Sequence, residues 1–139
     1  APRADAVISL HACDVATDMA LGFAIRHNAK NIICVPCCHK ELLDTYKKPD
    51  LDPIIKHGVF RARLNDILTD GLRCLKLEAC GYKVSCVEYC SPLDTPKNLL
   101  IKGKKVSDGD PKAEAEYRRL LSELGVRPSI EYYSVKCDD

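Results

Sequence analysis

Two short blocks of the sequence carry side chains that can accept a proton, bind a metal ion or act as nucleophiles. The first follows an apolar run from Ala6 to Leu10 and contains His11, Ala12, Cys13 and Asp14. The second follows an apolar run from Ile32 to Val35 and contains Pro36, Cys37, Cys38, His39 and Lys40. Short apolar runs are typical of strands buried on both faces, and ligand sites form where parallel strands end. We therefore expect both blocks to lie at the same edge of a sheet.

Each block offers one histidine, the side chain whose pKa best suits proton transfer near neutral pH. His11 and His39 could each take a proton from a nucleophile or orient that nucleophile. Either could instead cap a helix or bond a backbone carbonyl, and this structural role has the stronger support. The sequence alone leaves both roles open.

The cysteines of the second block also invite a zinc interpretation, because Cys-x-x-Cys spacing lets two thiolates reach one tetrahedral ion. Cys34 and Cys37 have this spacing, but Cys34 is expected to point into the sheet and the chain has no second such pair. The remaining candidate set is Cys13, Cys37, Cys38 and His39. We expect no bound metal.

The nine cysteines are an odd count in a chain longer than the small disulfide scaffolds, so we expect reduced thiols. Cys34 and Cys86 lie inside predicted strands and are expected to pack as small apolar groups.

The composition is that of one folded domain. The 139 residues are 46% hydrophobic and 29% charged, which is enough apolar material for a core. The formal charge is +1, from 21 basic and 20 acidic side chains, so composition gives no global sign of nucleic-acid binding. No stretch approaches the roughly 18 apolar residues of a membrane span, and the N-terminus lacks a signal-peptide core. We expect a cytoplasmic protein with no membrane partner.

The first half of the chain predicts a strand, a helix and a second strand. Apolar residues recur at helical spacing after Asp14, which we expect to cap a helix that ends near His27. The second apolar run follows within a few residues. Such a crossover unit gives a parallel sheet, and parallel sheets need helices on both faces.

The second half predicts a loop over residues 47–58 and a long helix whose leucine stripe runs from Leu64 to Ala79. Strands over residues 82–89 and 98–102 are joined by a short turn-rich link, which favours antiparallel neighbours. A last helix should begin at Pro111 after an Asp110 cap and end at Gly125. The tail, residues 129–135, is strand-like, with no evident partner.

This order of elements resembles the second half of a class I S-adenosylmethionine-dependent methyltransferase domain, from its fourth strand to its seventh. The blocks His11 to Asp18 and Pro36 to Leu42 resemble the methyltransferase domains of the family that includes the glutathione S-transferase C-terminal-domain-containing protein. They are more distantly similar to the His-x-Cys-Gly-x-Ala-Thr-Asp and Cys-Cys-His blocks of tRNA ribose methyltransferases. The resemblance covers about residues 5–105.

The resemblance implies a three-layer α/β, Rossmann-like half-fold with a mainly parallel sheet and an antiparallel last strand. Residues 1–106 would form the half-domain, and residues 107–139 would add a helix and the strand-like tail, packed on the same domain. The implied activity is methyl transfer from S-adenosylmethionine. The implied site residues are the catalytic candidates His39 and His11, the cofactor-side residues His11, Ala12 and Asp14, and the substrate-side residues Pro36, Cys37, Cys38 and Lys40.

The chain also departs from the family pattern. The Gly-rich turn after the first strand and the acidic residue ending the second, which hold the cofactor in the family, are absent. Five residues precede the first predicted strand, so we expect the family's first three strands to be missing and cofactor binding by this chain alone to be weak. The exposed edge of the strand from Ala6 to Leu10 should then be covered by a second copy, by the missing half or by a rearranged tail.

The methyl acceptor is left open between RNA and protein. Several basic residues could contact RNA phosphates: Lys97, Lys102, Lys104, Lys105, Arg61, Arg63 and Arg73. The sequence favours a solvated surface over RNA contact, since acidic residues are almost as numerous and no aromatic residues are interleaved with the basic ones. The alternative function is a non-catalytic interaction module, or an inactive fragment, that pairs through its open strand edge.

Overall fold

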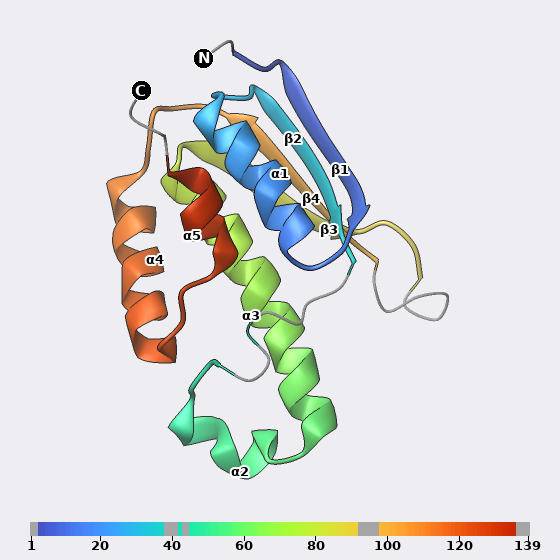
Figure 1. The fold of residues 1–139 in the computed structure, drawn as a ribbon, viewed down its shortest axis with the longest axis vertical. Coiled ribbons are helices and arrows are strands. Elements are labelled where there is room, and N and C mark those ends of the chain that lie inside the picture. Colours follow the sequence, from blue (N-terminus) through green and yellow to red (C-terminus); the bar gives the residue numbers. More distant parts are fainter. Residues whose placement is uncertain (1–2, 38–41, 43–44, 92–97, 136–139) are drawn as a thin grey trace.

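The computed structural model describes residues 3–37, 42, 45–91 and 98–135 and folds them as a sheet with helices against it (Figure 1). The strands of this part of the chain are β1 (Ala6–Ala12), β2 (Asn31–Pro36), β3 (Tyr82–Glu88) and β4 (Leu99–Lys105). Its helices are α1 (Val15–Arg26), the 3-10 turn η1 (Pro49–Leu51), α2 (Asp52–Ile55), α3 (Gly58–Ala79), α4 (Pro111–Leu124) and α5 (Ser129–Ser134).

The sheet has the order β1-β2-β4-β3. β1 and β2 pair in parallel, and β4 lies between β2 and β3, antiparallel to both. Three strands therefore share one direction and the last strand in the chain opposes them. The α/β class, the parallel first pair and the antiparallel last strand are confirmed, and the arrangement is consistent with a Rossmann-like methyltransferase half-fold.

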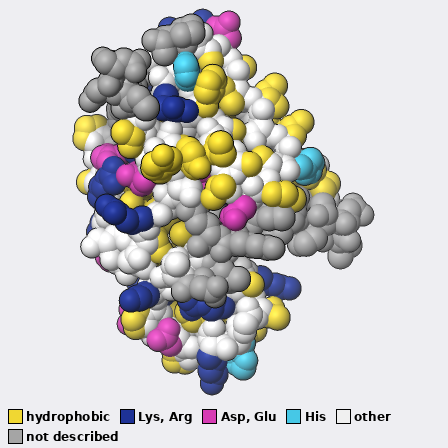
Figure 2. Space-filling model, viewed as in Figure 1, with side chains coloured by type: hydrophobic (Ala, Val, Ile, Leu, Met, Phe, Trp, Pro, Cys, Tyr) yellow, Lys and Arg dark blue, Asp and Glu magenta, His cyan; other side chains and the backbone are white. Residues whose placement is uncertain are grey.

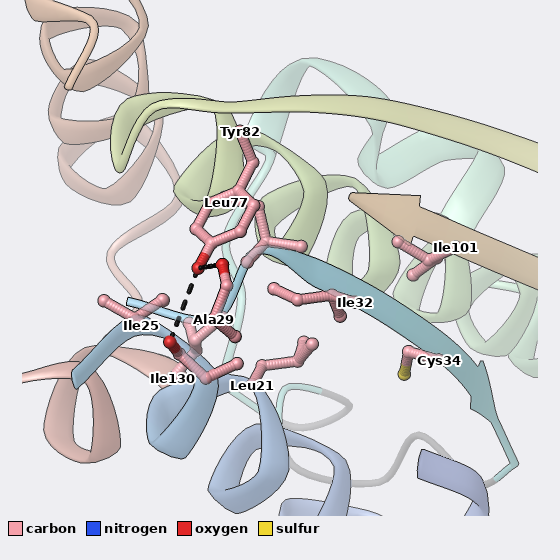
Figure 3. Close-up of a cluster of buried hydrophobic side chains, with 10 residues drawn as sticks. Leu21, Ile25, Ala29, Ile32, Cys34, Leu77, Tyr82, Ile101 and Ile130 are labelled. Carbon is pink, nitrogen blue, oxygen red and sulfur yellow. Dashed lines mark hydrogen bonds between the residues drawn. The ribbon is translucent and has the colours of Figure 1, made fainter. Parts of the chain in front are cut away.

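One face of the sheet carries the main hydrophobic core (Figure 3). Leu21 of α1, Leu77 of α3 and Ile130 of α5 pack into the same buried cluster, whose remaining members are Ala24, Ile25, Ala29, Ile32, Cys34, Tyr82 and Ile101. The Tyr82 hydroxyl donates a hydrogen bond of 2.7 Å to the Ala29 carbonyl, which satisfies the polar end of this buried ring. Three helices thus cover one face of the sheet, and α4 packs on α3.

The opposite face of the sheet has no helix against it within the described ranges. Because side chains alternate along a strand, Ile8 and Leu10 of β1 point to this face, and they are 62% and 61% exposed. The sequence led us to expect helices on both faces. The connection from β1 to β2 contains α1, the connection from β2 to β3 contains α3, and both run in the same direction across the sheet. Because such crossover connections are right-handed, both helices are placed on the same face of the sheet. We call this second surface the uncovered face.

Apolar side chains also occur on the outer surface of the helices, among charged ones (Figure 2). Met19 and Phe23 of α1 are 49% and 44% exposed. Exposed apolar surface is therefore not confined to the uncovered face.

The tail prediction is wrong, because residues Ser129–Ser134 form α5 rather than a strand. Ile130 and Ser134, four residues apart, are both buried, whereas Tyr132 between them is exposed. This spacing of four is helical. A six-residue segment with mixed apolar and polar positions fits both the helical period of about 3.6 residues and the strand period of two, so its contacts decide between them. The described part of the tail packs on α1 and does not extend the β1 edge.

The loop prediction for residues 47–58 is wrong in part. Pro49 and Pro53 each occupy a first-turn position, of η1 and α2 respectively, where a missing amide proton is harmless. Both predicted ends of α4 were correct. Asp110 accepts hydrogen bonds from the Lys112 and Ala113 amides, and Gly125 ends α4 with a φ of 65°.

The close packing of α1 on α5 yields a stability prediction. A Cβ added at Gly22 would lie 2.4 Å from the Tyr133 carbonyl oxygen, whereas one added at Gly71 of α3 would meet nothing within 4 Å. Gly22→Ala should destabilise the fold by about 1–3 kcal/mol, despite the better helix propensity of alanine. Gly71→Ala should stabilise it by about 0.5–1 kcal/mol. Urea unfolding followed by circular dichroism tests this, and equal stability of the two variants would contradict the packing.

Candidate functional site

The first candidate block lies at the carboxyl end of β1, where the strand is irregular. The β1–β2 register shifts between Leu10 and Ala12, so His11 is an extra residue in a bulge. His11 and Asp14 have φ angles of 54° and 48°, a left-handed conformation that non-glycine residues rarely adopt. The bulge leaves the His11 side chain exposed, and Cys13 is exposed beside it. Reactive groups of this block are therefore accessible to a ligand.

A buried ion pair holds this strained turn in place. The Arg73 guanidinium, from the C-terminal part of α3, donates to both carboxylate oxygens of Asp18, with its Nε at 2.8 Å from Oδ1 and its Nη2 at 2.9 Å from Oδ2. Both side chains are only 2% exposed. Nη1 of Arg73 also donates to Asp70 at 3.1 Å. Burial opposes the charge of Arg73, but hydrogen bonds to Asp18 and the negative charges of Asp18 and Asp70 outweigh it and raise the pKa of Arg73.

The same guanidinium reaches the backbone of the candidate site. Nη2 of Arg73 donates a hydrogen bond of 3.1 Å to the Asp14 carbonyl. Thr17, in the first turn of α1, donates from its hydroxyl to the Ala12 carbonyl at 2.8 Å. Two carbonyls of the turn are thus fixed by side chains from α1 and α3, which supports the left-handed conformations at His11 and Asp14.

Sequence reasoning missed this network and misassigned two of its members. Asp14 was expected to cap α1, but its side chain makes no capping hydrogen bond. Arg73 was grouped with residues that could contact RNA, but it is buried and paired with Asp18. A signal was present for Asp18, because it lies three residues before Leu21 and seven before Ile25, on the buried stripe of α1. A charged residue on such a stripe requires a partner.

The second candidate block is described only at its start. Pro36 of β2 is buried and pairs in register with Ala12 of β1, and Cys37 is partly buried. The prediction that both strands end at one edge, side by side, is confirmed by this pairing. Cys38, His39 and Lys40 lie outside the described residues, so their roles stay predictions.

Within the described ranges, no three His, Cys, Asp or Glu side chains are placed to hold a metal ion. Two members of the candidate metal set, Cys38 and His39, fall outside those ranges. Cys34 is fully buried as expected, and burial raises the pKa of its thiol to about 12. Cys86 was expected to pack in the same way, but it is exposed, because β3 runs along the edge of the sheet.

The predicted basic cluster is split between the two sides of the sheet. Lys102 and Lys104 of β4 point to the uncovered face, where Lys83 of β3 lies directly opposite Lys104. They line a hollow of about 440 Å³ together with Asn31, Ile33 and Ser85. Lys105 turns the other way, with its ammonium 4.8 Å from the centre of the Tyr82 ring and hydrogen bonded to the Cys80 carbonyl. Lys97 lies outside the described residues.

The other two arginines of the predicted basic set differ from each other. The Arg61 guanidinium stacks over the Tyr46 ring at 4.3 Å and donates to the Tyr46 carbonyl at 2.9 Å. Arg63 is exposed. Of the predicted basic set, the exposed members among the described residues are Lys102 and Lys104 on the uncovered face and Arg63 on α3.

Comparison with known proteins gives one finding. A family model described as a methyltransferase domain matches residues 1–45. This segment contains β1, α1 and β2, so it includes both strand ends and the whole of the first candidate block. No curated protein and no solved structure matches the chain. Among the described helices, none is both long and apolar enough to cross a bilayer.

The network around Arg73 yields a second stability prediction. Arg73→Met should destabilise the protein by about 3–5 kcal/mol, because the Asp18 carboxylate would stay buried without its partner. Adding Asp18→Asn should recover part of this loss. Arg119 of α4 is the matched control, since it also contacts two carboxylates, those of Glu116 and Glu123, but at the surface. Arg119→Met should change stability little. Equal losses in the Arg73→Met and Arg119→Met variants, measured by urea unfolding, would contradict the anchoring role.

Proposed function

We propose that this chain supplies the substrate-side half of an S-adenosylmethionine-dependent methyltransferase domain. The observation that carries the proposal is the pairing of Ala12 with Pro36, inside the segment matched by the methyltransferase family model. This pairing brings the starts of the two candidate blocks together at the carboxyl edge of a parallel pair of strands, where ligands bind in open α/β sheets.

The first block suits one wall of a cofactor site. His11 and Cys13 are exposed and Asp14 is partly exposed, so polar groups from this turn are available to a ligand. Asp14 can accept hydrogen bonds, and Ala12 leaves room beside it. S-adenosylmethionine would supply the methyl group. The chain's own part would be to position the acceptor and to hold its proton.

Methyl transfer to an oxygen or nitrogen requires an aligned acceptor and a route for its proton. His11 projects from a bulge whose backbone is fixed through Arg73 and Thr17, which supports a role as the proton acceptor. His39 is the second candidate on sequence grounds. Pro36, Cys37, Cys38 and Lys40 would face the methyl acceptor.

The completing half would pack against β1. β1 is an edge strand, and within the described ranges no strand pairs with its outer side. The adjoining part of the uncovered face carries the exposed side chains of Ile8 and Leu10. Apolar surface next to an open edge favours a protein partner, either the cofactor-binding half or a second copy.

RNA is the acceptor that we favour. Lys83, Lys102 and Lys104 lie on the β3–β4 half of the uncovered face, away from the apolar β1 edge. Like charges directly opposite each other destabilise a sheet, so the Lys83–Lys104 pair would gain from an anionic ligand such as a phosphate backbone. A resemblance to tRNA ribose methyltransferases agrees with this choice. A cytoplasmic location, expected from the sequence, is part of the proposal.

A second candidate function uses the same edge without catalysis. The unpaired edge of β1 and the apolar residues beside it would also serve an interaction module that adds a strand from a partner.

Two measurements separate these functions. Isothermal titration calorimetry of this chain alone with S-adenosylmethionine should show no binding at micromolar concentration. A polypeptide that also carries a Gly-rich cofactor half should transfer a labelled methyl group to RNA, and His11→Ala or His39→Ala should lower kcat by about 10²–10⁴-fold.

His57→Ala is the control, because His57 lies at the start of α3, outside both blocks. Micromolar binding by the isolated chain would show that a cofactor site is already complete. Unchanged kcat in both histidine variants would contradict their catalytic assignment, and methylation of neither RNA nor protein would favour the interaction module.

A further inference from the structure

Two cysteines from different elements meet at the edge of the helix layer. Cys74 lies in α3 and Cys86 in β3, and their Sγ atoms are 3.0 Å apart. The two elements follow each other in the chain and pack together. A disulfide requires sulfurs about 2.0 Å apart, so a movement of about 1 Å would bring this pair to bonding distance.

We propose that Cys74 and Cys86 are a modification site that forms a reversible disulfide by exchange with a low-molecular-weight disulfide. This inference does not depend on the proposed methyl transfer, because it rests on two residues outside both candidate blocks.

The surroundings of the pair allow a small oxidant to reach it. Cys86 is exposed, and a cavity of about 360 Å³ is lined by both cysteines together with Ile67 and Leu99. Asp66 and Asp70 also line it. The cavity therefore admits a small neutral or cationic disulfide more readily than an anionic one.

The two thiols differ in environment, and this difference gives the order of the steps. Burial raises the pKa of the Cys74 thiol, and its contact with Cys86 raises it further. Since the thiolate is the attacking species, the exposed Cys86 reacts first. Cys34 provides a contrast within the same protein, because it is fully buried in the core.

The exchange balances in two steps. The Cys86 thiolate attacks one sulfur of the small disulfide, the sulfur–sulfur bond of that reagent breaks, and one small thiol leaves with the proton that Cys86 has lost. Cys74 then attacks the Cys86 sulfur of the mixed disulfide, and the second small thiol leaves with the Cys74 proton. The two protein thiols are oxidised to one disulfide, and the reagent is reduced to two thiols.

The Cys74–Cys86 disulfide would affect the candidate site because Cys74 lies close to a residue that supports that site. Cys74 is the residue next to Arg73, whose side chain fixes the turn between β1 and α1. A covalent link from Cys74 to β3 would hold this part of α3 on the sheet and would restrict movement of the guanidinium.

The experiment treats the reduced chain with hydroxyethyl disulfide, a neutral reagent, and removes the excess. Mass spectrometry of a tryptic digest should show the peptides of Cys74 and Cys86 joined with a loss of two hydrogens and without reagent, whereas the exposed Cys13 can form a mixed disulfide with the reagent. Trypsin should release residues 74–76 joined to residues 84–97, and Cys90→Ser makes the second peptide unambiguous. The melting temperature should rise by about 10 °C on oxidation and return on addition of dithiothreitol.

Cysteine variants provide the controls. Cys74→Ser should stop at a mixed disulfide on Cys86, and Cys86→Ser should form neither product. Cys80→Ser, at the C-cap of α3 and six residues along the chain from Cys74, should oxidise like the wild type. The peptide map of the wild type tests the pair even if a variant folds poorly. A mixed disulfide that persists on wild-type Cys86, a cross-link between other cysteines, or no reaction at all would overturn the proposal.

Discussion

The ion pair between Arg73 and Asp18 is the interaction on which the arrangement of this protein depends. A guanidinium and a carboxylate that are both removed from water are tolerated only when each has its partner, so α1 and α3 cannot shift independently without exposing or orphaning a charge. The same guanidinium holds the Asp14 carbonyl. The left-handed turn that presents His11 is therefore stabilised by a side chain from the C-terminal part of α3, and the geometry of the strand edge is set from within the helix layer.

The distribution of helices explains why the protein has two unlike surfaces. α1, α3 and α5 bury one face of the sheet in a common core, while the other face is divided between the apolar side chains of β1 and the lysines of β3 and β4. In the described part of the chain no helix covers the second face of the parallel pair, which is unusual, because such sheets are ordinarily covered on both sides. The apolar surface at β1 is suited to contact with a protein, and the lysine surface at β3 and β4 is suited to contact with an anion.

The features that could be predicted from the sequence are those encoded by neighbouring residues. The Asp110 cap, the Gly125 terminator and the antiparallel pairing of β3 with β4 follow from short patterns, and the structure has all three. The tail was mispredicted because its six residues fit both the helical and the strand period. Its helix becomes evident only when Ile130 is seen to pack against α1 in the core. Asp18 and Arg73 are far apart in the sequence, so their pairing could be found only from the packing of α1 on the sheet beside α3. At the candidate site, the adjacency of the two strand ends was predictable, whereas the bulge at His11 was not.

The position of β4 also determines the order in which the chain can fold. β2 and β3 do not touch, since β4 lies between them and pairs with both. During synthesis, β3 leaves the ribosome before the strand that attaches it to the sheet, so it has no partner until residues Leu99–Lys105 emerge. Until then β1 and β2 are the pair available among the four described strands, and the apolar side of β3 depends on α3 for cover. Assembly of the sheet is therefore a late, long-range event, which slows folding and prolongs the exposure of an unpaired strand.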